Sequence, residues 1–145
     1  MNIREPLSRD DFQRYYELRW EILRAPWKQP RGSEQDALES SSHHLMVTDD
    51  HQAVVAVGRL HFNTTHEAQI RYMAVAAGQQ RKGIGTRLLR ALENRAVALG
   101  AECIKLEARE TALGFYLRNN YRPEGPGHRL FNTITHVSMT KSFHR

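Results

Sequence analysis

The sequence predicts an α+β protein in which helices lie on the faces of a mixed, mostly antiparallel β-sheet, as α/β/α layers. Three patterns lead to this prediction. Residues 45–75 contain three strand-like segments separated by two polar turns, the apolar period changes to helical spacing at Ile84, and a further apolar alternation follows at 103–108. Because strand, helix and strand follow one another at this spacing, residues 67–75 and 103–108 should run parallel as a central βαβ unit.

The N-terminal third is expected to hold a strand, a helix and an irregular segment. Residues 3–7 favour a short first strand. Asp10 or Asp11 can cap the helix that follows, and Pro26 should end it. Residues 25–42 are rich in proline, glycine and serine and therefore favour a loop, in which Ser33 could cap a short helix. A loop of this length is a suitable place for substrate specificity.

The remaining elements follow from the same periodicities. Residues 45–48 and 53–60 form a predicted hairpin, and 67–75 is the third strand. The long helix that begins at Ile84 presents one apolar face and can end at Gly100; the face consists of Ile84, Leu88, Leu89, Leu92, Ala96 and Leu99. A second helix is expected at 111–118, and strands are expected from Tyr121 and at 134–140.

Composition narrows the class of protein. The chain has 145 residues, a size typical of a single domain spanning 1–145, with 40% hydrophobic and 26% charged residues. No apolar run approaches the length of a membrane span, and the first residues lack the apolar core of a signal peptide. The lone Cys103 is interpreted as a small core residue in a reducing cytoplasm. The net charge of +5 favours an anionic ligand, but its scattered distribution argues against nucleic acid.

The segment Gln80-Arg81-Lys82-Gly83-Ile84-Gly85-Thr86 joins the third strand to the long helix. Its glycines allow a ligand to approach the backbone, and the helix N-terminus supplies unpaired N–H donors and a positive dipole end. Arg81, Lys82 and Arg87 add positive charge. The segment therefore predicts a phosphate-binding cradle, although it matches neither a Walker loop nor G-x-G-x-x-G. A tight turn without a ligand is the alternative.

This loop, written Q/R-x-x-G-x-G/A, resembles the acetyl-CoA signature of the GNAT superfamily of N-acyltransferases. Met73-Ala74-Val75 is similar to the end of that family's fourth strand, and residues 112–121 resemble its A-x-x-F-Y-x-x-x-G-F segment. Asn120 and Tyr121 stand where the family usually has Gly and Phe, and Asn tolerates the left-handed conformation of that Gly. The order of elements agrees over most of the chain, least specifically over its first forty residues.

The resemblance implies a GNAT-like fold in which strands four and five diverge around the pantetheine arm of acetyl-CoA. The backbone of Met73, Ala74 and Val75 would then pair with the pantetheine amides. The pyrophosphate would lie on the loop, whose residues are Gln80, Arg81, Lys82, Gly83, Ile84, Gly85 and Thr86. Tyr116 matches the tyrosine that protonates the departing thiolate, although a tyrosine there can also simply pack on pantetheine. Phe115 and Arg118 would help to hold the cofactor.

The general base is less clear, because the position of a family glutamate holds Gln69, which cannot take a proton. His136 lies on a late strand and would titrate near neutral pH. Glu67, on the same strand face as Gln69, and a water chain without a dedicated base are alternatives. Three other histidines, His43, His44 and His61, are further candidates for the general base.

The sequence thus favours an N-acetyltransferase that moves an acetyl group from acetyl-CoA to a primary amine of a small molecule or peptide by direct attack. Side chains expected to shape the acceptor pocket are Trp20, Glu21, Trp27, Glu34 and Asp36. The alternative is a non-catalytic sensor or interaction module that binds acyl-CoA with the same fold. No metal-ligand spacing is present, no nucleic-acid or membrane partner is expected, and a homodimer is possible.

Overall fold

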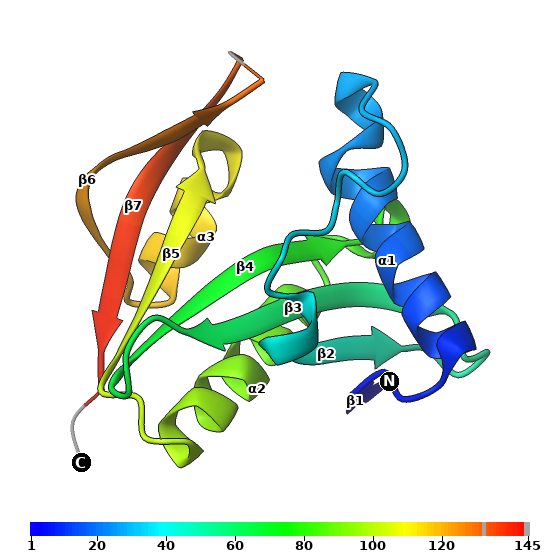
Figure 1. The fold of residues 1–145 in the computed structure, drawn as a ribbon, viewed down its shortest axis with the longest axis horizontal. Coiled ribbons are helices and arrows are strands. Elements are labelled where there is room, and N and C mark those ends of the chain that lie inside the picture. Colours follow the sequence, from blue (N-terminus) through cyan, green and yellow to red (C-terminus); the bar gives the residue numbers. More distant parts are fainter. Residues whose placement is uncertain (132, 144–145) are drawn as a thin grey trace.

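The structure, a computed structural model, describes residues 1–131 and 133–143 and contains one seven-stranded sheet with the order β1-β2-β3-β4-β5-β7-β6 (Figure 1). Only β4 and β5 pair in parallel, so the predicted α+β class and the central βαβ unit are confirmed. The strands are β1 (Asn2–Arg4), β2 (His43–Thr48), β3 (Val54–Phe62), β4 (Glu67–Val75), β5 (Cys103–Arg109), β6 (Arg122–Leu130) and β7 (Ile134–Ser142).

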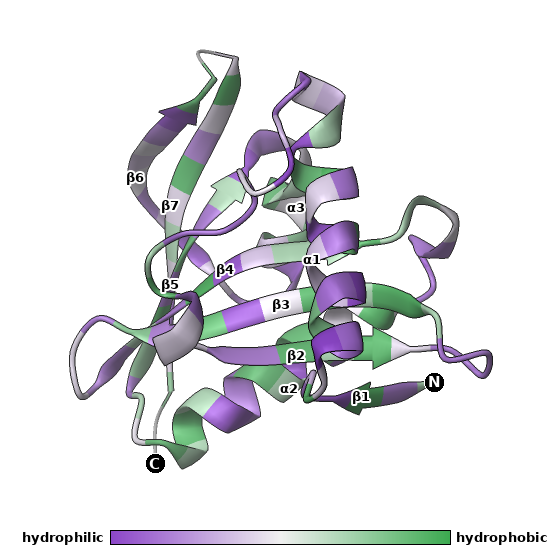
Figure 2. Ribbon diagram, turned by 45° about the vertical axis from the view of Figure 1, so that its right-hand side comes forward, coloured by the Kyte–Doolittle hydropathy of each residue, from purple (hydrophilic) through white to green (hydrophobic). Residues whose placement is uncertain are grey.

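Three α-helices accompany the sheet: α1 (Arg9–Leu23), α2 (Ile84–Ala98) and α3 (Leu113–Arg118). Short 3₁₀ turns are η1 (Ala25–Trp27), η2 (Glu39–Ser41), η3 (Ala77–Gln79) and η4 (Glu110–Ala112). The helix proposed from Ser33 is wrong, because residues 31–34 and 37–38 form turns and the first helical turn there is η2. Figure 2 shows α1 lying across the sheet with much of its length hydrophilic.

The start of α1 corrects the sequence interpretation of its cap. Ser8, not Asp10 or Asp11, is the N-cap, and its hydroxyl accepts a hydrogen bond from the Asp11 N–H at 3.0 Å. Asp11 lies three residues later and accepts from the Ser8 N–H in return, which completes a capping box. The first strand is also shorter than predicted, because Leu7 and Ser8 already lead into this cap.

Two apolar clusters lie on opposite faces of the sheet. The larger joins β2–β5 and β7 to α2 and α3, with Leu88, Leu89 and Leu92 fully buried. The smaller joins α1 to β2, β3 and β4 through Tyr15, Leu18 and their neighbours. We call these surfaces the α2 face and the α1 face of the sheet. The α2 helix ends at Ala98, and Gly100 follows the C-cap Leu99 as the predicted C′ residue, with a φ of 106° that glycine adopts without strain.

A β-bulge interrupts β4 at Tyr72, whose φ is 58°. Ala74 pairs with Val57 and Arg71 pairs with Arg59, so two residues of β4 stand opposite the single Gly58 of β3. Arg71 and Tyr72 therefore turn their side chains to the same face, where both contact one carboxylate oxygen of Asp36, at 3.1 and 3.4 Å.

Strands β4 and β5 pair over only part of their length. Glu67–Ile70 lie beside Cys103–Leu106, and beyond these residues the two strands diverge, as Figure 1 shows. The edge of β4 from Arg71 to Val75 that would face β5 is thus free of a neighbouring strand. This opening between the strands is the divergence that the family resemblance implied.

Candidate active site

The N-terminus of α2 lies beside the opening between β4 and β5. Gly83 is its N-cap with φ of 79°, and no described side chain caps the helix. A Cβ built on Gly83 would meet no atom within 4 Å, so the space next to this backbone is open. Uncapped N–H groups next to open space are the arrangement that binding of an anion requires.

The end of β4, the start of α2 and the short helix α3 meet at one place. The Phe115 ring lies 3.4 Å from the position that a Cβ on Gly85 would take, and Val75 lies 3.7 Å from that position. The distant helix α3 is thus brought to the junction of β4 and α2, as binding of one ligand by all three segments requires.

The side chain of Tyr116 extends from α3 to β4. Its hydroxyl donates to the thioether sulfur of Met73 at 3.7 Å, and its ring packs edge-on against Phe115 and Tyr121. A thioether is a weak acceptor, so the phenol retains capacity for a better one. Burial raises the pKa of Tyr116 to about 12, which keeps the proton on its oxygen at neutral pH.

Several other residues predicted to bind the cofactor are exposed or half-buried. The Gln80 side-chain amide donates to the Val75 carbonyl at 3.3 Å and so ties the loop to the end of β4. Arg81 has a φ of 65°, and both Arg81 and Lys82 are exposed. Thr86 is half-buried in the first turn of α2, and Arg118 is exposed on α3. Asn120 has a φ of 71°, which confirms the left-handed conformation expected for it.

His136 lies on β7 directly opposite Arg109 of β5. Its Nδ1 is 3.0 Å from the His128 carbonyl oxygen, which can only accept, so Nδ1 carries the proton and Nε2 is left as an acceptor. The two rings stack with centroids 4.1 Å apart. Burial, and then the neighbouring His128, lower the pKa of His136, which favours the neutral ring that a base requires.

The alternative bases are occupied. Gln69 and Glu67 both accept from the Asn63 amide, at 3.0 and 2.9 Å, in the part of β4 that is still paired with β5. His44 is held between the Tyr15 hydroxyl and the Glu39 carbonyl, each at 2.8 Å. His61 contacts Arg59 and Asn63.

The half-buried Cys103 lies at the start of β5, and burial raises the pKa of its thiol, which disfavours the thiolate.

The α1 face carries an ionic network that the sequence did not reveal. Arg59 is fully buried and donates to Asp36 at 2.6 Å and to Glu39 at 2.7 Å. Asp36 also pairs with Arg71, and Glu39 also pairs with Arg19. The Tyr72 ring lies within 6 Å of four guanidinium carbons; they belong to Arg19, Arg24, Arg59 and Arg71. Of the predicted acceptor-pocket residues, Asp36 joins this network and Trp27 lies under Arg109.

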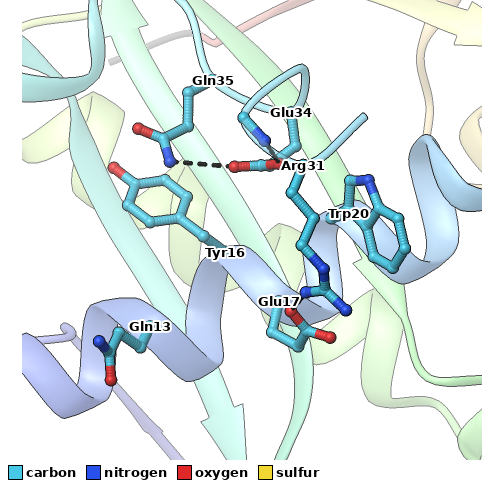
Figure 3. Close-up of a pocket in the computed structure, with 8 residues that line it drawn as sticks. Gln13, Tyr16, Glu17, Trp20, Arg31, Glu34 and Gln35 are labelled. Carbon is cyan, nitrogen blue, oxygen red and sulfur yellow. Dashed lines mark hydrogen bonds and ion pairs between the residues drawn. The ribbon is translucent and has the colours of Figure 1, made fainter. Parts of the chain in front are cut away.

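A pocket of about 420 Å³ opens between α1 and the turn at residues 31–35 (Figure 3). Within it Arg31 pairs with Glu17, and Gln35 donates to Glu34 at 2.9 Å. The lining residues are Gln13, Tyr16, Glu17, Trp20, Arg31, Gly32, Glu34 and Gln35. None belongs to β4, β5, α3 or the loop before α2, so this pocket is separate from the opening in the sheet.

Residues 1–131 and 133–143 contain no cluster of His, Cys, Asp or Glu suited to hold a metal ion. Within the same ranges, no helix combines the length and the apolar character needed to cross a membrane.

Comparison with known proteins shows the family of this chain. A sequence model of the "Acetyltransferase (GNAT) family" matches residues 12–140. The uncharacterized N-acetyltransferase YjcF of Bacillus subtilis is 29% identical over 124 residues, which cover 86% of this chain and 87% of YjcF.

Solved structures agree in fold. An acyl-CoA N-acyltransferase from Pseudomonas aeruginosa superposes with a TM-score of 0.81 at 21% identity, covering 97% of both chains. An aminoglycoside 6'-N-acetyltransferase in complex with coenzyme A gives 0.79 at 16% identity, covering 98% of this chain and 97% of its own.

The fold is that of the acyl-CoA N-acyltransferases, and the protein is an enzyme of this acyltransferase class. The chain belongs to the GNAT acetyltransferase family. Family membership resolves the choice between an enzyme and a non-catalytic sensor in favour of the enzyme.

Proposed function

We propose that this protein transfers the acetyl group of acetyl-CoA to a primary amine of a small molecule or peptide. The observation that carries the proposal is the unpaired edge of β4 beside the uncapped N-terminus of α2. A pantetheine arm needs amide partners of the kind that an unpaired strand edge offers, and a pyrophosphate needs clustered N–H donors. The residues present therefore fit coenzyme A.

Each part of the opening has a proposed task. Met73, Ala74 and Val75 offer backbone groups along the β4 edge, while the loop from Gln80 to Thr86 holds the phosphates. Phe115 packs at the start of α2 and limits access of water. Acetyl-CoA, when bound, supplies a thioester carbonyl that an amine can attack. By fixing both reactants in the opening, the chain would lower the entropic part of the barrier.

Two side chains are proposed to transfer protons in the reaction. Tyr116 keeps its phenol protonated and has only a weak sulfur acceptor, so it can donate to the sulfur that departs. His136 is neutral with Nε2 free to accept among the described residues, so it can take a proton from the attacking amine, directly or through water.

The first test is direct binding and turnover. Calorimetry with coenzyme A and release of free thiol from acetyl-CoA with a panel of amines should both be positive. Absence of coenzyme A binding would sink the proposal.

A matched pair of variants tests the cradle. Gly83→Ala places a side chain at φ of 79° beside the loop, whereas Gly32→Ala introduces a comparable strain at φ of 99°, also in open space but outside the loop. Coenzyme A affinity should fall in Gly83→Ala and stay unchanged in Gly32→Ala. Equal affinity in both variants would contradict the cradle assignment.

A further inference from the structure

Two arginines on the α1 face lie side by side, and neither forms an ion pair with a described residue. Arg24 follows α1 and Arg109 ends β5, and both donate to the carbonyl oxygen of Leu23, at 2.9 and 3.1 Å. Arg24 is only 6% exposed and Arg109 is half-buried. Two guanidinium groups that share one neutral acceptor are necessarily close neighbours.

The nearby carboxylates do not form an ion pair with Arg24 or Arg109. Glu34, whose charge acts on Arg24, accepts from the Gly32 N–H and the Gln35 amide. Asp36 binds Arg59 and Arg71, and Glu39 binds Arg19 and Arg59. In residues 1–131 and 133–143, no carboxylate lies within 4.0 Å of the Arg24 or Arg109 guanidinium. Burial, and then the charge of Arg24, lower the pKa of Arg109 to about 10, a sign of uncompensated positive charge.

Aromatic rings and backbone groups hold the pair in place while leaving donors free. The Arg109 guanidinium stacks 4.7 Å from the centre of the Trp27 ring, and that of Arg24 lies between Tyr72 and Phe131. Arg24 uses Nε for Ser33 and Nη1 for Leu23, and Arg109 uses only Nη2. Toward the described residues, Nη2 of Arg24 and Nε and Nη1 of Arg109 make no hydrogen bond.

The pair borders the opening where transfer is proposed. Arg109 lies beyond the last parallel pair, Ile70 with Leu106, and directly opposite His136. Arg24 contacts the ring of Tyr72, whose chain neighbour Met73 begins the proposed pantetheine-binding edge. A group bound by Arg24 and Arg109 would therefore belong to a molecule that enters the opening from the α1 face.

We propose that Arg24 and Arg109 bind an anionic group, a carboxylate or a phosphate, carried by the amine acceptor. Guanidinium forks match the paired oxygens of both groups, and an anion here would supply the missing counter-charge. The inference rests on the proposed acetyl transfer and narrows its substrate class from primary amines in general to amines with a negative charge.

The test uses matched amines that differ in charge. One set is 4-aminobutyrate, its amide and butylamine, another is an α-amino acid with its amide and its decarboxylated amine, and a third is O-phosphoethanolamine with ethanolamine. The anionic members should have kcat/KM at least about tenfold higher, since charge-assisted hydrogen bonds contribute that much to affinity. Comparison of the sets distinguishes a carboxylate from a phosphate. Equal or better turnover of the neutral amines would overturn the proposal.

Variants locate the effect. Arg109→Gln should remove the preference for anionic amines, and Arg109→Lys, which keeps the charge without the fork, should restore part of it. The control is Arg95→Gln, which removes a surface arginine of α2 that pairs with Glu5. The affinity for coenzyme A should be unchanged in all three. A tenfold loss of coenzyme A affinity in Arg109→Gln would assign the pair to the cofactor and overturn the proposal.

A binding measurement separates this inference from the proposed function. Titration with inorganic phosphate or succinate should shift the side-chain N–H signals of Arg24 and Arg109 in NMR spectra, saturably in the wild type and in Arg95→Gln. Shifts without turnover of any amine would refute acetyl transfer but support the anion site. Turnover without shifts or charge preference would refute the anion site alone.

Discussion

The two faces of the sheet are built on different chemistry. On the α2 face, leucines and other apolar side chains fill the space under the helix, and a buried carboxylate, Glu93, binds the Tyr121 hydroxyl and the Lys141 ammonium. On the α1 face, arginines and acids form a network, and Arg24 and Arg109 are left over. Since buried charge seldom adds stability, its concentration on one face indicates a role in binding.

The largest effect on stability is expected when an arginine that is paired with carboxylates is removed. Arg59→Gln should lower the free energy of unfolding by about 3–5 kcal/mol, because the partly buried Asp36 and Glu39 lose the fully buried guanidinium that they share. Arg109→Gln should lose at most the roughly 1 kcal/mol of one hydrogen bond, since it also removes repulsion from Arg24. Urea unfolding at neutral pH measures both, and equal losses would show that Arg109 is a structural member of the network.

On the α2 face, the free energy of unfolding should fall when a substitution creates a cavity. Leu92→Ala should lower the free energy of unfolding by about 2–5 kcal/mol, because Leu92 is fully buried and packs close to Gly58. Leu99→Ala, at the end of the same helix and 48% exposed, should change stability little. If the two substitutions had similar effects in urea unfolding, the α2 face would not be the dominant core.

On the α2 face the reaction itself is tested at Tyr116. Tyr116→Phe keeps the ring packed against Phe115 and Tyr121 but removes the proton donor. Turnover should fall about 100-fold, the size typical of a lost general acid, whereas coenzyme A affinity and stability should remain. Thiol release and calorimetry measure these quantities; unaltered turnover would reduce Tyr116 to a packing residue.

The subtlest effect concerns pH and His136. A base must be unprotonated, so the rate should fall as the pH drops through the pKa of His136. Burial holds that pKa below the ordinary value, which places this acidic limb below about pH 6.5. His136→Gln should abolish the limb and leave only the titration of the amine. A rate profile unchanged by the substitution would instead favour proton transfer through water alone.

The α2 face was largely predictable because its signals are local. Helical spacing from Ile84, the glycines of the loop and the alternation in β5 are each visible within a few residues, and the parallel pairing follows from a general rule of chain topology. The capping box of α1 was visible too, because Ser8 and Asp11 stand three residues apart, but Asp10 and Asp11 were the more conspicuous caps.

The α1 face was not predictable because its arrangement depends on contacts across the fold. Arg24 and Arg109 meet at a carbonyl that only the docking of α1 places there. The bulge at Tyr72 turns two consecutive side chains to one face, and no glycine in β4 marks it. Arg24 lies two residues before Pro26 and Arg109 lies at a strand end, but other arginines occupy similar positions, so nothing local marks these two as a pair.

The short pairing of β4 with β5 leaves a narrow join between two halves of the sheet. Strands β1–β4 form one half and β5, β7 and β6 the other, and they join through four residue pairs, the first being Glu67 with Cys103 and the last Ile70 with Leu106. Arg109, at the end of β5, reaches the Leu23 carbonyl at the end of α1 and the Trp27 ring of η1. Because α1 packs on β2, β3 and β4, Arg109 links the two halves by a contact that does not depend on the hydrogen bonds between β4 and β5.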